Sequence, residues 1–306
     1  MGKANKKRVR HKLTRRDRND YIWGYAMVAP LVIGLLVFYF YPFFQSIYMS
    51  FTKTGAFNQS QWNGIENYVE LIGDKTFWQS LKNTFVFVVM TVPVGIFLSM
   101  VLAALLNSKI KGTSFYRTIY FLPSVTMAAA ISLVWKWIYN GDYGLLNAVL
   151  GMFGIKGMSW LTNPKTVMVA IGVVGIWCSC GYNTIILLAG LQGISSSYYE
   201  AAAIDGAGPL YVFRKITFPL LSPTIFFVVV TSLINGLKTF DLVYMMVPKE
   251  SPVYKQAQTV VMYFYRNAFD YANKGYASAI AVAIFVIIML LTILQMRMQK
   301  HWVIYE

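Results

Sequence analysis

Six long apolar segments, separated by polar connections, set the strongest limit on how this chain can fold. Each has room for a helix of about 20 residues, the length that crosses the hydrocarbon core of a membrane. A chain inside that core must satisfy its backbone hydrogen bonds within itself, which favours helices. The segments are expected at residues 23–51, 84–107, 118–139, 166–192, 217–237 and 275–296. The sequence therefore predicts an all-α polytopic membrane protein with six transmembrane helices.

Composition supports this class, since 57% of the residues are hydrophobic and only 13% are charged. The net charge of +15 would also suit a nucleic-acid-binding protein. We exclude that class because the basic residues lie mostly in one terminal tail and in short connections between apolar segments. Two parts are predicted: a basic cytoplasmic tail at residues 1–20, close to anionic lipid head groups, and a transmembrane domain at residues 21–306. The first apolar segment is too long for a cleaved signal peptide.

The basic residues also predict the orientation of the spans. If the N-terminus is cytoplasmic, sixteen basic residues face the cytoplasm and nine face outward in longer connections. Cytoplasmic connections are typically enriched in Lys and Arg. Both termini, and the connection between the fourth and fifth spans, are therefore expected on the cytoplasmic side.

No arrangement of residues in the sequence indicates an enzyme. The two histidines, His11 and His301, lie in the two tails, so neither a buried histidine base nor a histidine-bound metal is expected. Cys178 and Cys180 are two apart on a helix and point to different faces, which argues against a disulfide or a shared metal. A Walker A sequence is absent, so energy from a nucleotide must come from another subunit. We expect no catalytic residue, metal site or cofactor in this chain.

Polar side chains inside two spans form the candidate solute pathway, because hydrocarbon disfavours them. In the fourth span Tyr182 and Asn183 share a face, with Trp177 near it; in the fifth, Ser232, Asn235 and Thr239 share a face. Amide, hydroxyl and aromatic groups together suit a neutral polyol. The alternative is that these groups only bond neighbouring helices, at about 1 kcal/mol each. Lys238 and Asp241, where the fifth span leaves the membrane, are expected to pair with each other, and the alternative is that they contact the solute.

A polar stretch between the fourth and fifth spans carries the most specific pattern in the chain. Glu200 and the alanines after it favour a short helix, with Ser195, Ser196 or Ser197 as its N-cap and Glu200 in its first turn. Gly206 and Gly208 then end that helix, and Pro209 opens a second one. The expected result is two short helices meeting at a glycine corner.

This stretch resembles the E-A-A-x-x-x-G-x(9)-I-x-L-P loop of bacterial ABC importer permeases. The residues at matching positions are Glu200, Ala201, Ala202, Gly206, Ile216 and Pro219, and Phe218 replaces the usual leucine. At the glycine the loop reads Asp205, Gly206, Ala207, which resembles the sequence found in the carbohydrate-importing branch of the family. That branch takes up maltose, multiple sugars or glycerol phosphate. The resemblance implies that these residues form a cytoplasmic coupling helix that binds an ATPase. It also implies that the fourth and fifth spans line the translocation site.

The resemblance further implies the partners of the chain. It predicts a transmembrane subunit of an ATP-driven, binding-protein-dependent importer for a sugar or sugar-like solute. The subunit would pair with a second, similar permease in the bacterial cytoplasmic membrane and receive solute from an extracytoplasmic binding protein. Two separate ATPase subunits would bind ATP and Mg. The identity of the sugar does not follow from the sequence.

Two other classes compete with this interpretation. An ion-coupled secondary transporter of a small polar solute would need carboxylates inside the membrane, and none lies within the predicted span interiors. A membrane-embedded enzyme would need paired acid and base groups, which are missing.

Overall fold

The computed structural model describes residues 15–54, 60–108 and 112–304, so most of the predicted basic tail, together with Lys109 and Lys111, lies outside the described residues. Within this part of the chain, five helical segments are long and apolar enough to cross a membrane. They are Arg16–Ser50, α4 (Lys75–Asn107), α8 (Val167–Gly193), Pro209–Leu237 and α15 (Lys274–Gln299). These segments match five of the six predicted spans, with ends that extend several residues further.

The third predicted span is broken in the middle, so the expectation of one helix over residues 118–139 is wrong. The chain instead forms α5 (Thr113–Val125) and α6 (Ala128–Ile138), which are bent by 100° relative to each other. Thr126 and Met127 between them have extended ψ angles of 140° and 134°. Pro123, inside α5, has no backbone N–H to bond the preceding turn, which weakens the helix just before the break. The pair counts as a sixth crossing only if both halves are taken as one span.

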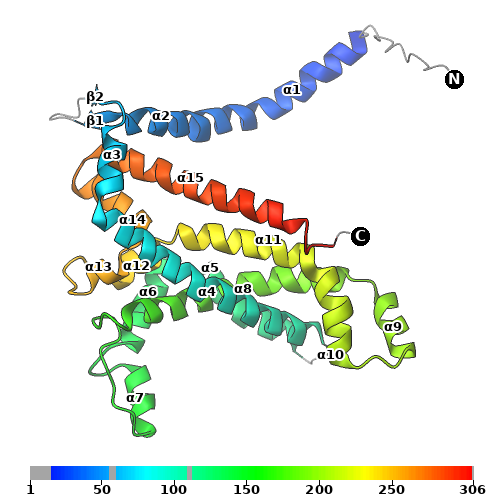
Figure 1. The fold of residues 1–306 in the computed structure, drawn as a ribbon. Coiled ribbons are helices and arrows are strands. Elements are labelled where there is room, and N and C mark those ends of the chain that lie inside the picture. Colours follow the sequence, from blue (N-terminus) through cyan, green and yellow to red (C-terminus); the bar gives the residue numbers. More distant parts are fainter. Residues whose placement is uncertain (1–14, 55–59, 109–111, 305–306) are drawn as a thin grey trace.

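The first span consists of α1 (Arg15–Leu35), a π-helical turn at Leu36–Phe40, and α2 (Tyr41–Ser50). The helix therefore already includes the last residues assigned to the basic tail. Only its second half packs on the bundle: Phe43 of α2 meets Phe285 of α15 edge-on, with ring centroids 5.2 Å apart. α1 extends away from the other spans (Figure 1).

Short elements gather at both ends of the bundle (Figure 1). One end carries an antiparallel hairpin, in which Thr52 pairs with Trp62, and several short helices. These are β1 (Thr52–Thr54), β2 (Ser60–Trp62), α3 (Glu66–Gly73), α7 (Leu145–Met152), α12 (Asp241–Met246), α13 (Tyr254–Ala257), α14 (Val260–Tyr265) and a π-helical turn at Arg266–Asp270. The opposite end carries α9 (Ser196–Ile204) and α10 (Pro209–Val212), together with the start of α1 and the end of α15. The hairpin and the short helices of the first end were not predicted from the sequence.

The core lies where α4, α8 and α11 (Phe218–Leu237) pack together. Ile171 and Val174 of α8 are fully buried near one end, and Leu187 is fully buried near the other. Lipid tails are as apolar as these side chains, so close packing rather than water exclusion holds such helices together. Small residues serve that purpose by letting backbones approach.

Gly181 of α8 lies very close to the backbone of a neighbouring helix. A β-carbon added there would lie 2.0 Å from the carbonyl oxygen of Tyr120 in α5 and 2.8 Å from its carbon. Because both atoms are backbone, a side chain at this position forces the two helices apart. Gly181 therefore holds α5, and the break that follows it, against α8.

Asp74 anchors the end of the bundle that carries the hairpin. Its carboxylate caps α4 by accepting from the Thr76 amide at 2.7 Å, and it also accepts from the hydroxyls of Tyr263 and Tyr276 at 2.5 and 2.6 Å. Partial burial raises the pKa of Asp74, but these hydrogen bonds outweigh burial and leave that pKa below its ordinary value. The carboxylate thereby joins the start of α4 to α14 and α15.

We predict that Gly181→Ala destabilises the assembled protein, because the added methyl group meets the Tyr120 carbonyl. Overpacking of this kind costs about 1–3 kcal/mol. Gly193→Ala in the same helix is the matched control, since nothing lies within 4 Å of an added β-carbon there. Thermal unfolding in detergent should show a lower midpoint for Gly181→Ala and no loss for Gly193→Ala. Equal midpoints would contradict the close approach of α5 and α8.

Candidate functional site

A cavity of about 500 Å³ lies between α4, the α5–α6 break, α8, α11 and the segment that follows α11. Each of these elements contributes polar groups to its wall. The break forms part of its wall, because Ser124, Thr126 and Ala128 on either side of it line the cavity. The cavity is thus built where the structure departs from the simple six-helix expectation.

Five of the six candidate pathway residues line this one cavity: Tyr182, Asn183, Ser232, Asn235 and Thr239. The helical spacing on α8 and α11 brings them to facing sides. Trp177 is the exception, because its ring packs edge-on against Trp135 of α6, with centroids 5.7 Å apart, outside the cavity wall.

Asn183 and Ser232 connect the two helices across the cavity wall. The Asn183 side-chain amide donates to the Ser232 hydroxyl at 3.2 Å, and Asn183 is only 4% exposed. Tyr182 and Asn235 are exposed within the same wall. The structure therefore combines one buried interhelical bond with open hydrogen-bonding groups in the same wall.

Several lining groups were not identified from the sequence. Thr91 of α4, Ser124 of α5 and Thr126 at the break face the cavity, and Pro123 beside them was the signal that the third span is interrupted. Lys238 and Asp241 also line it. These two do not form an ion pair within the described part of the chain, so the expected pairing is wrong. Cys178 lines the cavity as well, whereas Cys180 accepts a hydrogen bond from Ser99 of α4 at 3.4 Å.

This set of groups can bind a neutral, hydroxyl-rich solute. Amides and hydroxyls both donate and accept, while the Tyr182 ring and Phe240 offer apolar faces to a sugar ring. Among the described residues, no cluster of three or more His, Cys, Asp or Glu side chains has the arrangement of a metal site. The cavity thus fits binding and passage of a polyol by hydrogen bonds and ring contacts.

The polar stretch between α8 and α11 forms the corner that the sequence predicts. Ser195 caps α9 by accepting from the Ser197 amide, and Gly206 has a φ of +71°. The helix ends in a Schellman motif, because the Ala207 amide donates to the Ala202 carbonyl at 2.9 Å and the Gly206 amide to the Ala203 carbonyl at 3.2 Å. Glycine is the residue that adopts this left-handed conformation without strain.

Two details of this corner differ from expectation. Glu200 lies in the second turn of α9, because the cap is at Ser195 rather than closer to Glu200, so its charge is not at the first turn. α10 is not a separate short helix, since it continues through a π-helical turn at Phe213–Thr217 into α11. The segment that bears the corner is therefore continuous with a membrane span.

The other candidate residues of this stretch differ in their exposure. Glu200, Ala201, Asp205 and Gly206 are exposed, while Ala202 is buried within the chain. Ala207, Ile216 and Pro219 are half-buried. α9 therefore presents exposed residues next to a corner fixed by the φ of Gly206.

The start of α11 contacts the C-terminal segment through a hydrogen bond and a ring contact. Pro223 lacks an N–H, so the carbonyl of Pro219 has no helical donor, and the Ser222 hydroxyl donates to it instead at 2.6 Å. The Ser222 oxygen also accepts the Ile304 amide at 3.0 Å, and Trp302 packs edge-on against Phe226. These contacts stabilise the helix just after the π-helical turn.

Comparison with known proteins identifies the class of this chain. Residues 73–303 match the family model described as "Binding-protein-dependent transport system inner membrane component". The chain is 37% identical to "Probable ABC transporter permease protein YesP" of Bacillus subtilis over 96% of both chains. It is 36% identical to "Lactose transport system permease protein LacF" of Rhizobium radiobacter over 89% of this chain and 92% of that one.

A solved structure has the same fold. It is a bacterial ABC transporter involved in the import of the acidic polysaccharide alginate, and the match has a TM-score of 0.83 at 23% identity, covering 94% of this chain and 97% of that one. At this identity the match establishes the fold and nothing about the solute.

Proposed function

Because the chain belongs to the family of binding-protein-dependent transport system inner membrane components, we propose that it forms one half of the sugar pathway of an ATP-driven importer. The observation that carries this proposal is the cavity between α8 and α11, whose amide, hydroxyl and aromatic groups suit a polyol. The 36% sequence identity of the chain to a lactose permease supports a sugar as the solute. Lys238 adds N–H donors and Asp241 adds carboxylate acceptors for sugar hydroxyls.

The proposal includes partners that complete the importer. A second, similar permease supplies the other half of the pathway, and an extracytoplasmic binding protein delivers the sugar. Two ATPase subunits bind ATP and Mg, so this chain contributes no nucleotide site. Each α9 docks on one ATPase through its exposed face, which carries Glu200, Ala201 and Asp205.

The proposed orientation follows from what gathers at each end of the bundle. α9, α10, the start of α1 and the end of α15 share one end (Figure 1). Arg214 and Lys215 lie in the π-helical turn at this end, and Arg297 lies in the last turn of α15. Positive charge favours the cytoplasmic side. We therefore assign this end, with both termini, to the cytoplasm.

The connection between docking and transport runs through continuous helices. α8 ends at Gly193, two residues before the Ser195 cap of α9, and α10 continues into α11. A movement of α9 by the ATPase is therefore passed to the two helices that carry the cavity residues. ATP binding and hydrolysis would open the cavity alternately to each side of the membrane.

Uptake by the reconstituted complex tests the sugar assignment. Proteoliposomes that hold this chain, its sister permease, the ATPases and the binding protein should accumulate a labelled sugar from a panel of lactose, maltose and raffinose only with ATP. Asn235→Leu should lower uptake per complex by about two- to tenfold, the effect of one lost hydrogen bond. Asn183→Leu should do the same and also break the bond to Ser232.

The control is Asn67→Leu, since Asn67 is buried outside the cavity and its side-chain amide donates to the Ser50 and Thr52 carbonyls at 2.8 and 2.9 Å. It should reduce the amount of assembled complex without changing uptake per complex. Unchanged uptake per complex in either cavity variant would remove that residue from the pathway. ATP-independent uptake that an ionophore abolishes would instead favour an ion-coupled transporter.

Changes in the corner test the docking role. Gly206→Pro cannot adopt the observed φ of +71°, and Glu200→Lys reverses an exposed charge on α9. Both variants should insert normally but lose ATPase co-purification or sugar-stimulated ATP hydrolysis. Matched controls are Gly208→Ala, at an ordinary φ of −70° with open space around it, and Glu250→Lys, outside the docking corner. Normal stimulation in Gly206→Pro and Glu200→Lys would mean that this stretch is only a connection.

A further inference from the structure

A cluster of aromatic rings leads out of the cavity at the end opposite α9. Phe240 lines the cavity and stacks on Tyr244 of α12, with ring centroids 5.0 Å apart. Tyr265 of α14 packs against both rings, at 5.0 Å from Phe240 and 5.3 Å from Tyr244. Phe269 packs against Tyr265 at 4.8 Å. We call these four residues the aromatic ladder.

Among the rings of the ladder, the outermost one has the largest exposed fraction. Phe240 is half-buried, Tyr244 is 42% exposed and Phe269 is 67% exposed. Rings that served only to fill a core would be covered. The ladder instead connects the exposed ring of Phe269 to the cavity wall through the half-buried rings of Tyr265 and Phe240.

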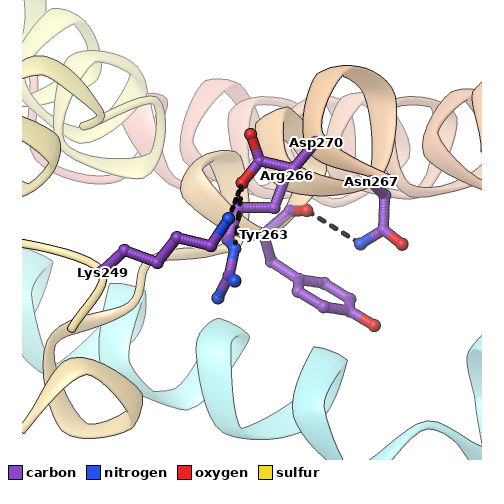
Figure 2. A network of polar contacts seen from close by, with 5 residues as sticks. All are labelled: Lys249, Tyr263, Arg266, Asn267 and Asp270. Carbon is purple, nitrogen blue, oxygen red and sulfur yellow. Dashed lines mark hydrogen bonds and ion pairs between the residues drawn. The ribbon is translucent and has the colours of Figure 1, made fainter. Parts of the chain in front are cut away.

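An ion-pair network fixes the turn that bears the outermost ring (Figure 2). Asp270, next to Phe269, accepts from the Lys249 ammonium at 2.9 Å and lies 3.5 Å from Nε of Arg266. The guanidinium of Arg266 lies over the rings of Tyr254 and Tyr271, at 4.8 and 5.4 Å from their centroids. The Lys249 hydrogen bond lowers the pKa of Asp270, so the carboxylate stays charged at neutral pH. An exposed ring on such a fixed turn is pre-organised for contact with another molecule.

We propose that the aromatic ladder is a sugar-binding track, on which a pyranose ring stacks after release from the binding protein and before it enters the cavity. The proposal rests on the proposed function. Sugar rings have apolar faces that pack on aromatic side chains, and successive rings about 5 Å apart let the solute contact the next ring before it leaves the last. The tyrosine hydroxyls add hydrogen-bonding groups along the edge.

The tyrosine pair supports a polar edge on the ladder. The rings of Tyr244 and Tyr265 pack edge-on with centroids 5.3 Å apart, and a hydrogen bond with the Tyr244 hydroxyl raises the pKa of Tyr265. A purely apolar contact surface for another helix would leave such hydroxyls without water. The surface therefore fits a hydroxylated ligand better than an apolar helix.

Kinetics of uptake separate capture on the ladder from passage through the cavity. In the reconstituted complex, Phe269→Ala and Tyr244→Ala should raise the half-saturating concentration of sugar-loaded binding protein by about three- to tenfold, as expected for one lost aromatic contact. The maximal rate should change much less. Tyr244→Phe keeps the ring and should retain most of the affinity. Phe153→Ala is the control, because Phe153 is 77% exposed but lies outside the ladder.

Phe269→Trp provides a direct readout of stacking. Lactose, maltose and raffinose, added in turn to the complex, should change the emission of this tryptophan in a saturable way relative to the wild-type background, and the open-chain polyol mannitol should not. Two results together would contradict the sugar-binding track. The tryptophan emission would already be blue-shifted and insensitive to sugar, and Phe269→Ala preparations would lose the sister permease. The ladder would then be a contact between subunits.

The kinetic outcomes distinguish the sugar-binding track from the proposed function as a sugar importer, on which it rests. Sugar uptake by the wild-type complex with unchanged half-saturation in Phe269→Ala and Tyr244→Ala would overturn the ladder alone. Failure of the wild-type complex to take up any sugar of the panel would overturn both.

Discussion

The structure depends on the close packing of α8 against its neighbours. Gly181 lets α5 lie against α8 at the distance of backbone contact, and Asn183 bonds α11 through Ser232. Without hydrophobic exclusion inside a membrane, such steric fit and interhelical bonds decide how the helices sit. The same contacts fix the positions of the α5–α6 break and of the polar groups that line the cavity.

α8 and α11 also connect the two functional regions of the chain. Their midsections carry the cavity residues, and their ends border the corner at Gly206. The Schellman motif and the Pro209 start of α10 make this corner rigid, and the Ser222 bonds stabilise the helix that follows. Because the corner at Gly206 is rigid and α10 continues into α11, a displacement of the corner also moves α11. This arrangement explains why one polar stretch and one cavity belong to the same mechanism.

Much of this architecture is predictable from the sequence because it is encoded locally. Apolar length predicts all six spans, of which five are continuous helices, and helical spacing predicts that Asn183 and Asn235 face one cavity. Gly206 and Pro209 predict the corner because their backbone preferences are strong. The break near Thr126 was missed because its residues are apolar enough for a span, although Pro123 was a signal. The ladder was missed because Tyr265 and Phe269 reach Phe240 only through tertiary packing.

The most direct test of the account is whether the nucleotide state at the α9 end changes access to the cavity. Cys178 lines the cavity, while Cys180 is turned toward Ser99, so the native thiols form a reporter and its internal control. The reconstituted complex would be treated from the binding-protein side with a membrane-impermeant methanethiosulfonate, and modification read by peptide mass. We predict faster modification of Cys178 when a non-hydrolysable ATP analogue is bound, with Cys180 unreactive throughout. Equal rates for Cys178 with and without the analogue would contradict the account.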